Sequence, residues 1–181
     1  MSGKLTDESI RKTFMELLEQ KSFSKITVKD ISERVGINRQ TFYYHYRDIV
    51  DLASSIIIDM CKDCFRPEND LSTCLMEIYD VMMREKPIVL NIVRSKNYDS
   101  LRLRLEPDIK RIMDGLVDRI PGTAMIPRQK RDFVVSYYAV AISSLVLRWI
   151  QEGMDVDRTF FHQLSLIIQT NLENTISILR G

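Results

Sequence analysis

The sequence predicts an all-α protein in which an N-terminal three-helix domain containing a helix-turn-helix is followed by a C-terminal helical bundle. Apolar residues recur at helical spacing along nearly the whole chain, and no segment shows the alternation expected of a strand. At 181 residues, of which 45% are hydrophobic and 28% charged, the chain can form one or two small domains with a buried core. We expect domains at residues 1–50 and 51–181.

The first predicted helix spans about residues 7–20 and leads into an apolar link. Its inward positions share helical spacing and are Ile10, Phe14, Leu17 and Leu18. Phe23 and Ile26 lie in the link and are expected to pack it against the second helix. The first helix should therefore support the two short helices that follow.

Residues 27–46 read as two short helices joined by a tight turn. Thr27 is a good N-cap, and Asp30 three residues later makes a near capping box. Gly36 can adopt the left-handed conformation that ends a helix, and Asn38 can cap the next one. The segment is thus predicted to be a helix-turn-helix, although any two short capped helices share this pattern.

The second helix of this pair is crowded with side chains that can contact DNA. Arg39, Gln40 and Thr41 are expected to read base edges, since arginine and glutamine suit guanine and adenine. Hydroxyl and imidazole groups commonly hold phosphates, and free N–H groups at a helix start also favour them. The expected phosphate contacts are Tyr43, Tyr44, His45, Thr27 and Lys29. Phe42 and Tyr46 are expected to face the core.

The same residues carry a resemblance to a known family. They fit the run I-x-x-x-x-G-[VI]-[SN]-x-x-T-[FL]-Y-x-[HY]-[FY] at Ile31, Gly36, Ile37, Asn38, Thr41, Phe42, Tyr43, His45 and Tyr46. The segment is similar to the DNA-binding domain of TetR/AcrR-type transcriptional regulators, and the length and helical content extend the resemblance to the whole chain. It implies a TetR-like fold, a homodimer bound to double-stranded DNA at a near-palindromic operator, and a C-terminal effector pocket.

Two positions depart from the pattern of that family. Many members carry a lysine just after the recognition helix, where this chain has Ile49. Arg47 is expected to take its place as a phosphate anchor. Gln40 replaces a common glycine and adds a potential base contact, and Asn38 completes the predicted DNA-binding set.

Charge alone does not indicate a nucleic-acid partner. The formal net charge is +1, and residues 1–50 hold nine lysines and arginines against seven acidic residues. DNA binding must therefore come from the arrangement of a few side chains in a local patch.

The remainder of the chain is predicted to be helical, with breaks at proline and glycine. A fourth helix is expected over about residues 48–65, before a break at 66–69. Pro107 either kinks a helix over residues 99–119 or starts a new one. The other predicted helices span residues 71–84, 88–94, 128–152 and 158–179.

The last two predicted helices are unusually apolar. In the segment 133–150 apolar side chains point in almost every direction around the axis, so a small domain cannot easily bury them all. A partner subunit would, through a four-helix interface with twofold symmetry. The expected interface residues are Val146, Ile150, Phe161, Leu164, Ile168 and Leu172. The alternative is that the penultimate helix lies at the centre of a monomer core.

Met and aromatic residues in the C-terminal half are candidates for a ligand pocket. The expected lining is Met82, Met113, Tyr137, Tyr138 and Trp149. Residues of these types at helical spacing are also typical of plain core, so this alternative stays open.

Several function classes are disfavoured by the sequence. Cys61 and Cys64 form a C-x-x-C, but with Cys74 and only two histidines the chain offers a poor zinc set and no disulfide framework. A thiol or metal sensor is therefore a minor alternative, and we expect no metal or cofactor. No nucleophile–base constellation or phosphate-binding glycine loop indicates an enzyme. The longest uncharged stretch, residues 133–147, is short for a membrane span, so we expect a soluble cytoplasmic protein.

Two functions fit these observations. The first is a homodimeric repressor whose operator binding is controlled by a small-molecule effector. The second is a transcriptional coactivator that works through a ligand-sensing partner protein. The run from Arg39 to Tyr43 and the stretch from Tyr137 to Gly153 resemble a subgroup that includes the coactivator of dihydroxyacetone kinase operons. A pocket closed by Trp149 and Tyr138 would favour the second function.

Overall fold

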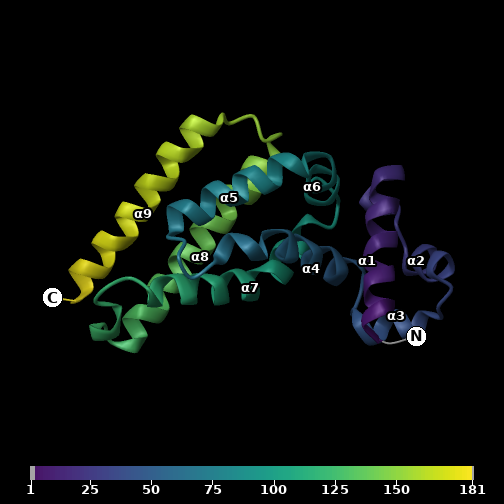
Figure 1. The fold of residues 1–181 in the computed structure, drawn as a ribbon, viewed down its shortest axis with the longest axis horizontal. Coiled ribbons are helices and arrows are strands. Elements are labelled where there is room, and N and C mark those ends of the chain that lie inside the picture. Colours follow the sequence, from purple (N-terminus) through teal and green to yellow (C-terminus); the bar gives the residue numbers. More distant parts are fainter. Residues whose placement is uncertain (1–2, 181) are drawn as a thin grey trace. The chain divides into compact units, whose positions relative to one another are not determined.

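The structure is a computed structural model that describes residues 3–180. Within this range the regular structure is entirely helical, which confirms the predicted fold class (Figure 1). Nine α-helices are described: α1 Gly3–Gln20, α2 Val28–Val35, α3 Arg39–His45, α4 Ile49–Cys61, α5 Leu71–Arg84, α6 Lys86–Val93, α7 Tyr98–Asp118, α8 Arg128–Gln151 and α9 Arg158–Arg180. Three 3-10 helices accompany them at Phe23–Lys25, Lys62–Phe65 and Thr123–Met125.

The chain folds into two compact units. The N-terminal unit contains the chain up to Asp59 together with Glu85–Arg104, and the C-terminal unit contains Met60–Arg84 and the chain from Leu105 onward. The division falls inside α4 and inside α7, so α6 packs with α1 rather than with its sequence neighbour α5. The predicted boundary after residue 50 divides a DNA-binding segment from the rest of the chain. This division is one of function, and it stays a prediction.

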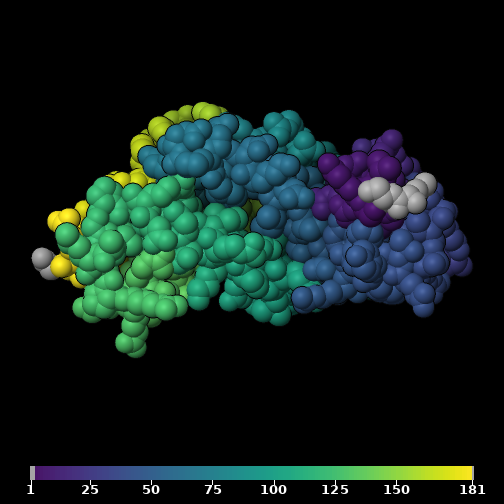
Figure 2. All heavy atoms as spheres, turned by 60° about the horizontal axis from the view of Figure 1, so that its bottom comes forward, coloured from purple at the N-terminus to yellow at the C-terminus, as the bar shows by residue number. Residues whose placement is uncertain are grey.

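In the N-terminal unit, α2 lies beside α1 and α3 beside α2 (Figure 1). The buried side of α1 carries the four apolar residues expected there, and Phe14 meets Phe23 edge to face with ring centroids 5.9 Å apart. In Figure 2 the purple atoms of α1 lie directly against the blue atoms of the helices that follow. The apolar link between α1 and α2 is therefore part of this core, as its sequence predicted.

In the C-terminal unit, α5 packs along α9, and α8 contributes the largest share of the buried core. That core joins side chains from α5, α7, α8 and α9: Leu71, Cys74, Leu75, Met113, Leu116, Val117, Val134, Val135, Tyr138, Ala139, Ile142, Leu172 and Ile176, with Ile126 from the loop. By length and composition alone α8 could cross a membrane, but core helices meet the same criterion. Its buried side chains belong here to a protein core.

The observed helices differ from the predicted ones in detail at Pro107, at Pro87 and at the end of α4. Pro107 lies inside a continuous α7, so it neither ends nor restarts the helix. Pro87 occupies the first turn of α6, where a missing N–H costs nothing, and α6 therefore begins two residues earlier than predicted. The fourth helix changes to 3-10 geometry after Cys61 instead of continuing to residue 65 as an α-helix.

Candidate nucleic-acid interface

The start of α2 is held by a complete capping box. The Thr27 hydroxyl accepts the N–H of Asp30 at 3.2 Å, and the Asp30 carboxylate accepts the N–H of Thr27 at 2.8 Å. Lys21 donates to the same carboxylate at 2.8 Å. The hydrogen bond from Lys21 is the main reason that the pKa of Asp30 falls from 3.8 to about 2, with Thr27 adding to it and burial opposing it. The helix that precedes the turn is thus fixed at its first residue.

The turn between α2 and α3 has the geometry that the glycine predicted. Gly36 has φ 77°, in the left-handed region, and its N–H and that of Ile37 both donate to the Ser32 carbonyl at 3.0 Å. Asn38 then caps α3 by accepting the N–H of Thr41 at 2.7 Å. The Thr41 hydroxyl donates to the same Asn38 oxygen at 3.0 Å. The side chains of Asn38 and Thr41, both predicted DNA contacts, therefore also hold the first turn of α3 together.

The helix α3 has one buried side and one polar exposed side. Phe42 is completely buried, and Tyr46 at the C-cap is buried beside it, as the sequence predicted. Tyr43 and Tyr44 are 54% and 85% exposed. Arg39 and Gln40 are exposed on the same side, and among residues 3–180 their side chains form no hydrogen bond or ion pair. Four donor-bearing side chains thus face outward from a helix anchored by one phenylalanine.

A polar network fixes the C-terminal end of α3. The Tyr46 hydroxyl donates to Asp7 of α1 at 2.5 Å and accepts from Arg11 at 3.1 Å. Arg11 also donates to Ser55 at 3.0 Å and to Asp59, both in α4. Burial, and then the hydrogen bond to Asp7, raise the pKa of Tyr46 above its usual value, so the hydroxyl keeps its proton. The end of α3 is therefore tied to α1 and α4 at once.

The other predicted DNA contacts lie around this surface. Thr27, Lys29 and Arg47 are exposed, and Lys29 pairs with Glu33 at 3.6 Å within α2. His45 differs from its neighbours because its side chain is only 14% exposed and its Nδ1 lies 3.9 Å from Asp7. A phosphate contact by His45 would require it to turn away from that carboxylate.

The five predicted pocket residues do not surround one cavity. Met82 and Met113 are buried, and Met113 belongs to the packed core. Trp149 stacks on Tyr79 with ring centroids 5.2 Å apart and also contacts Phe161 at 5.1 Å. Tyr138 is buried and its hydroxyl lies 3.1 Å from that of Thr175, whereas Tyr137 is 59% exposed. Four of the five residues are buried. Trp149 also lines an apolar cavity of about 290 Å³, and Tyr137 and Tyr138 line a groove of about 730 Å³.

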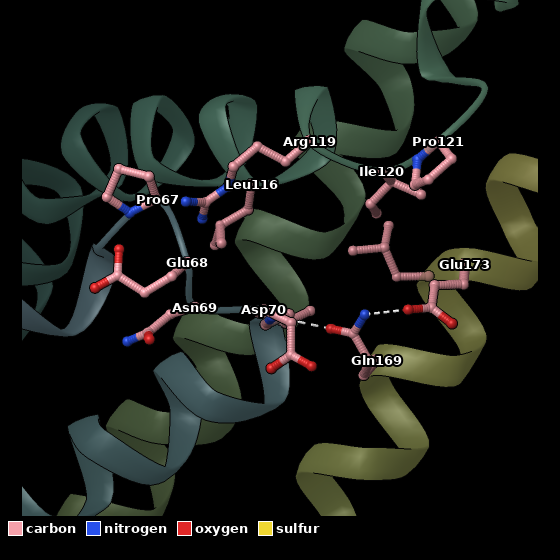
Figure 3. Close-up of a pocket in the computed structure, with 12 residues that line it drawn as sticks. Pro67, Glu68, Asn69, Asp70, Leu116, Arg119, Ile120, Pro121, Gln169 and Glu173 are labelled. Atoms are coloured by element: carbon pink, nitrogen blue, oxygen red, sulfur yellow. Dashed lines mark hydrogen bonds between the residues drawn. The ribbon is translucent and has the colours of Figure 1, made fainter.

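A cavity of about 240 Å³ with both polar and apolar lining residues lies elsewhere in the C-terminal unit, between the loop before α5, the end of α7 and α9 (Figure 3). Figure 3 shows Gln169 of α9 reaching Glu173 and the start of α5, where its Oε1 accepts the N–H of Leu71 at 2.9 Å. Arg119 donates to the carbonyl of Arg66 at 2.8 Å. This cavity could not be predicted from the sequence, because its lining comes from three segments far apart in the chain.

The apolar helices α8 and α9 leave an exposed face between them. Its most exposed large residues are Phe133, Tyr137, Val140 and Leu145 of α8 and Phe160, Leu164, Ile167 and Ile178 of α9. Phe133, Tyr137, Leu145 and Ile178 line a groove of about 730 Å³ between the two helices, and the other four residues lie outside it. Of the predicted interface residues, Leu164 is exposed, Val146, Phe161 and Ile168 are half-buried, and Ile150 and Leu172 are buried in the unit.

Comparison with known families identifies this architecture. The profile of bacterial regulatory proteins of the tetR family matches residues 10–56, and that of a transcriptional regulator C-terminal region matches residues 69–170, more than half of the chain. The chain belongs to the TetR family. It is therefore a transcriptional regulator, and members of this family are DNA-binding transcription factors rather than enzymes.

Individual TetR-family relatives are distant. The chain is 22% identical over 181 aligned positions to the HTH-type dhaKLM operon transcriptional activator DhaS of Lactococcus lactis subsp. lactis (strain IL1403), covering 91% of this chain and 89% of that protein. It is 34% identical over 59 residues to the uncharacterized HTH-type transcriptional regulator YxbF of Bacillus subtilis (strain 168). That match covers 32% of this chain and only 16% of YxbF.

Solved structures support the fold assignment. The dihydroxyacetone kinase operon activator DhaS superposes with a TM-score of 0.57 at 19% identity, covering 97% of this chain and 98% of that one. The TetR family repressor AlkX from Dietzia sp. strain DQ12-45-1b gives 0.60 at 16% identity, covering 92% and 97%. At these identities the likeness shows the shared fold of the TetR family.

The three cysteines of this TetR-family chain are all buried and free. Cys61 and Cys64 interact, and the hydrogen bond between them raises the pKa of Cys61 and lowers that of Cys64. Burial raises the pKa of Cys74 to about 11. Within residues 3–180 no group of three potential metal ligands comes together. These positions indicate packed thiols at the end of α4 and in α5.

Proposed function

We propose that this TetR-family chain is a homodimeric, operator-binding regulator that reads DNA with α3. The observation that carries the proposal is the outward side of α3, where Arg39, Gln40, Tyr43 and Tyr44 stand on a helix held by Phe42. Arginine and glutamine supply bidentate donors for base edges, and tyrosine hydroxyls suit phosphate oxygens. We assign Arg39, Gln40 and Thr41 to contacts with DNA bases. We assign Tyr43, Tyr44, Thr27, Lys29 and Arg47 to contacts with the DNA phosphate backbone.

The homodimer is proposed on the exposed face of α8 and α9. Eight large apolar or aromatic side chains on this face are each at least 38% exposed. A contiguous apolar surface of this kind is typical of a subunit interface, and the twofold repeat would place α8 and α9 of two protomers in a four-helix arrangement. Such a dimer presents two recognition helices to two half-sites of a near-palindrome.

For the regulatory input, a partner protein is favoured over a small molecule inside the bundle. Trp149, Tyr79 and Phe161 pack against each other, and Tyr138 is buried against Thr175. The packing of these rings on one another supports the coactivator function, and the 22% identity to the activator DhaS is in line with it. A repressor released by a small-molecule effector is the second candidate, supported by the cavity of about 240 Å³ near α9 and by the apolar cavity of about 290 Å³ beside Trp149 and Phe161. Both forms would act in the cytoplasm.

Selection of genomic DNA fragments by the purified full chain tests operator binding. The selection is made at one fixed salt concentration, because phosphate contacts make affinity depend on salt. We expect enrichment of a near-palindrome with half-sites about one helical turn or slightly more apart. Absence of any enriched sequence from a folded dimer would contradict direct operator binding.

A second experiment separates the two regulatory inputs. The tagged chain is expressed in its own host, purified with its bound proteins, and added to the selected DNA. Retention of a stoichiometric partner that changes transcription from the operator is expected for the coactivator. A free chain that represses alone, and whose operator affinity falls on addition of a cellular small-molecule extract, would favour the effector-controlled repressor instead.

A further inference from the structure

One side chain of α6 binds three backbone groups at the end of α1. The Asn91 amide nitrogen donates to the carbonyls of Leu18 at 2.8 Å and Lys21 at 3.0 Å. Its oxygen accepts the N–H of Phe23 at 2.9 Å. All three partners lie where α1 ends and the link to α2 begins, about 70 residues earlier in the chain.

These contacts satisfy groups that a helix end leaves open. The last carbonyls of an α-helix have no partner within it, and they usually bond to a local cap or to water. Here both donors and the acceptor of one amide are used, each with a good distance. Asn91 therefore acts as a C-cap for α1 that is supplied from another helix.

The helix that carries Asn91 is firmly seated. Val89, Ile92 and Val93 of α6 are completely buried, and Pro87 fixes its first turn. At the other end of α1, Asp7 binds the hydroxyl of Tyr46, which caps α3. A continuous set of contacts thus leads from α6 through α1 to the recognition helix.

A second side chain of the segment Glu85–Arg104, which contains α6 and the start of α7, reaches the residues just after α3. Arg104 of α7 donates to Asp48 at 3.0 Å and lies 3.8 Å from Asp51. Asp48 accepts the N–H of Asp51 at 2.8 Å, so Arg104 binds the cap of α4. The segment Glu85–Arg104 is therefore attached at two separate points, to the end of α1 and to the start of α4.

We propose that Asn91 is a positioning residue for operator binding: it fixes the end of α1, and with it the direction in which α3 points, to α6. The inference rests on the proposed dimeric operator binding, because only a dimer on two half-sites is sensitive to the direction of its two recognition helices. Asn91 touches no DNA in this account. The segment Glu85–Arg104 that carries Asn91 continues at both ends into the C-terminal unit, which contains α8 and α9. Loss of Asn91 should therefore leave the contacts of one recognition helix intact and loosen the distance between the two.

The test compares the full chain with Asn91→Ala and Asn91→Leu on DNA containing either one half-site or two half-sites at varied spacing. Leucine keeps the number and branching of the side-chain heavy atoms and so leaves no cavity, and this variant maintains the test if Asn91→Ala fails to fold. Ser100→Ala, an exposed polar position in the same segment, is the matched control. Hydrogen exchange at the Phe23 amide reports directly on loss of the contact.

We expect both Asn91 variants to bind a single half-site within about twofold of the wild type. Their preference for the best spacing over the next best should fall at least fivefold, and the Phe23 amide should exchange faster. A wild-type spacing preference in the variants, an equal loss on half and full sites, or unchanged exchange at Phe23 would overturn the inference alone. A wild-type chain without any spacing preference would overturn the proposed function and this inference together.

Discussion

Two surfaces of this TetR-family protein expose aromatic side chains, and they differ in what accompanies the rings. On α3, Tyr43 and Tyr44 stand among Arg39 and Gln40, so nearly every exposed group can donate a hydrogen bond. On α8 and α9, the exposed rings and aliphatic chains adjoin a groove whose polar lining residues, Asn171, Asn174 and Thr175, are all uncharged. The first surface suits a hydrated, charged polymer, and the second suits another apolar surface.

The difference teaches that exposure alone does not assign a partner. Phe133 is 73% exposed and Tyr44 is 85% exposed. Only the tyrosine has a hydroxyl that can exchange its hydrogen bond to water for one to a phosphate oxygen. A charged side chain introduced on the α8–α9 surface should therefore weaken association there, whereas removal of a hydrogen-bond donor from the α3 surface should weaken DNA binding.

The largest effect is expected from a charge on the apolar face. Ile167→Lys places a lysine twice in a twofold interface, and desolvation of each ammonium costs several kcal/mol. We expect the dimer dissociation constant to rise at least about 100-fold, which corresponds to about 2.7 kcal/mol. Analytical ultracentrifugation over a concentration series measures it, and operator affinity should fall in parallel because linked half-site binding is lost.

Leu166→Lys is the matched control for this prediction. Leu166 is the adjacent residue and is 47% exposed, against 55% for Ile167, but it lies on a different side of α9 from Phe160, Leu164 and Ile178. It should remain dimeric. Equal dissociation of both variants, or of neither, would place the interface on another surface.

The next effect concerns base reading on α3. Arg39→Ala or Gln40→Ala should lower the preference for the selected operator over a single-base variant by about 1–3 kcal/mol at the affected position. The far-ultraviolet circular dichroism spectrum should stay unchanged, because neither side chain packs in the core. Competition binding against a set of point-mutated operators measures the preference. A uniform loss on every sequence would show that these residues hold phosphates instead.

A smaller and sequence-independent effect is expected for a phosphate contact. Tyr43→Phe removes one hydroxyl and should weaken binding to the operator and to unrelated DNA alike, by about 1 kcal/mol. Fluorescence anisotropy with both DNAs at the same salt measures it. A changed preferred sequence would contradict the assignment of Tyr43 to the backbone.

The smallest effect concerns the support beneath the reading surface. Because the folded state lowers the pKa of Asp30 to about 2, its charge contributes stability above the ordinary value of 3.8. That contribution is lost as the pH falls toward 2. Since this carboxylate is about one-third exposed, Asp30→Asn should cost no more than about 1 kcal/mol at pH 6 and much less at pH 2.5.

Urea unfolding of the wild type and the variant at both pH values measures this difference. Glu33→Gln removes a more exposed carboxylate from the same helix and should change stability little at either pH. A cost for Asp30→Asn that is equal at the two pH values would show that the carboxylate charge is not what stabilises α2.

The local rules of the sequence were sufficient for the structure of the helix-turn-helix segment, α2 and α3. Thr27, Gly36 and Asn38 each act through backbone groups within a few residues, so their types predict the capping box, the left-handed turn and the second cap. The burial of Phe42 also follows from helical periodicity. Such contacts depend on little beyond the chain nearby.

The C-terminal sites depend on contacts between distant segments, and the sequence predicted them less completely. Tyr137 and Tyr138 are neighbours of one type, but the helix turns one outward and the other into the core. Phe133 and Ile167 are exposed on α8 and α9, whereas Ile150 and Leu172, which were predicted to lie in the interface, are buried. The apolar excess was visible in the sequence, but the side facing solvent depends on how α5 and α9 pack.

The most direct measurement is a hydroxyl-radical footprint of the wild-type protein on its selected genomic fragment, together with the mass of the complex. We predict two protomers on each fragment and two protected patches on one face of the duplex, about one helical turn or slightly more apart. One protomer with a single protected patch would contradict a regulator that dimerises through α8 and α9 and reads two half-sites with α3.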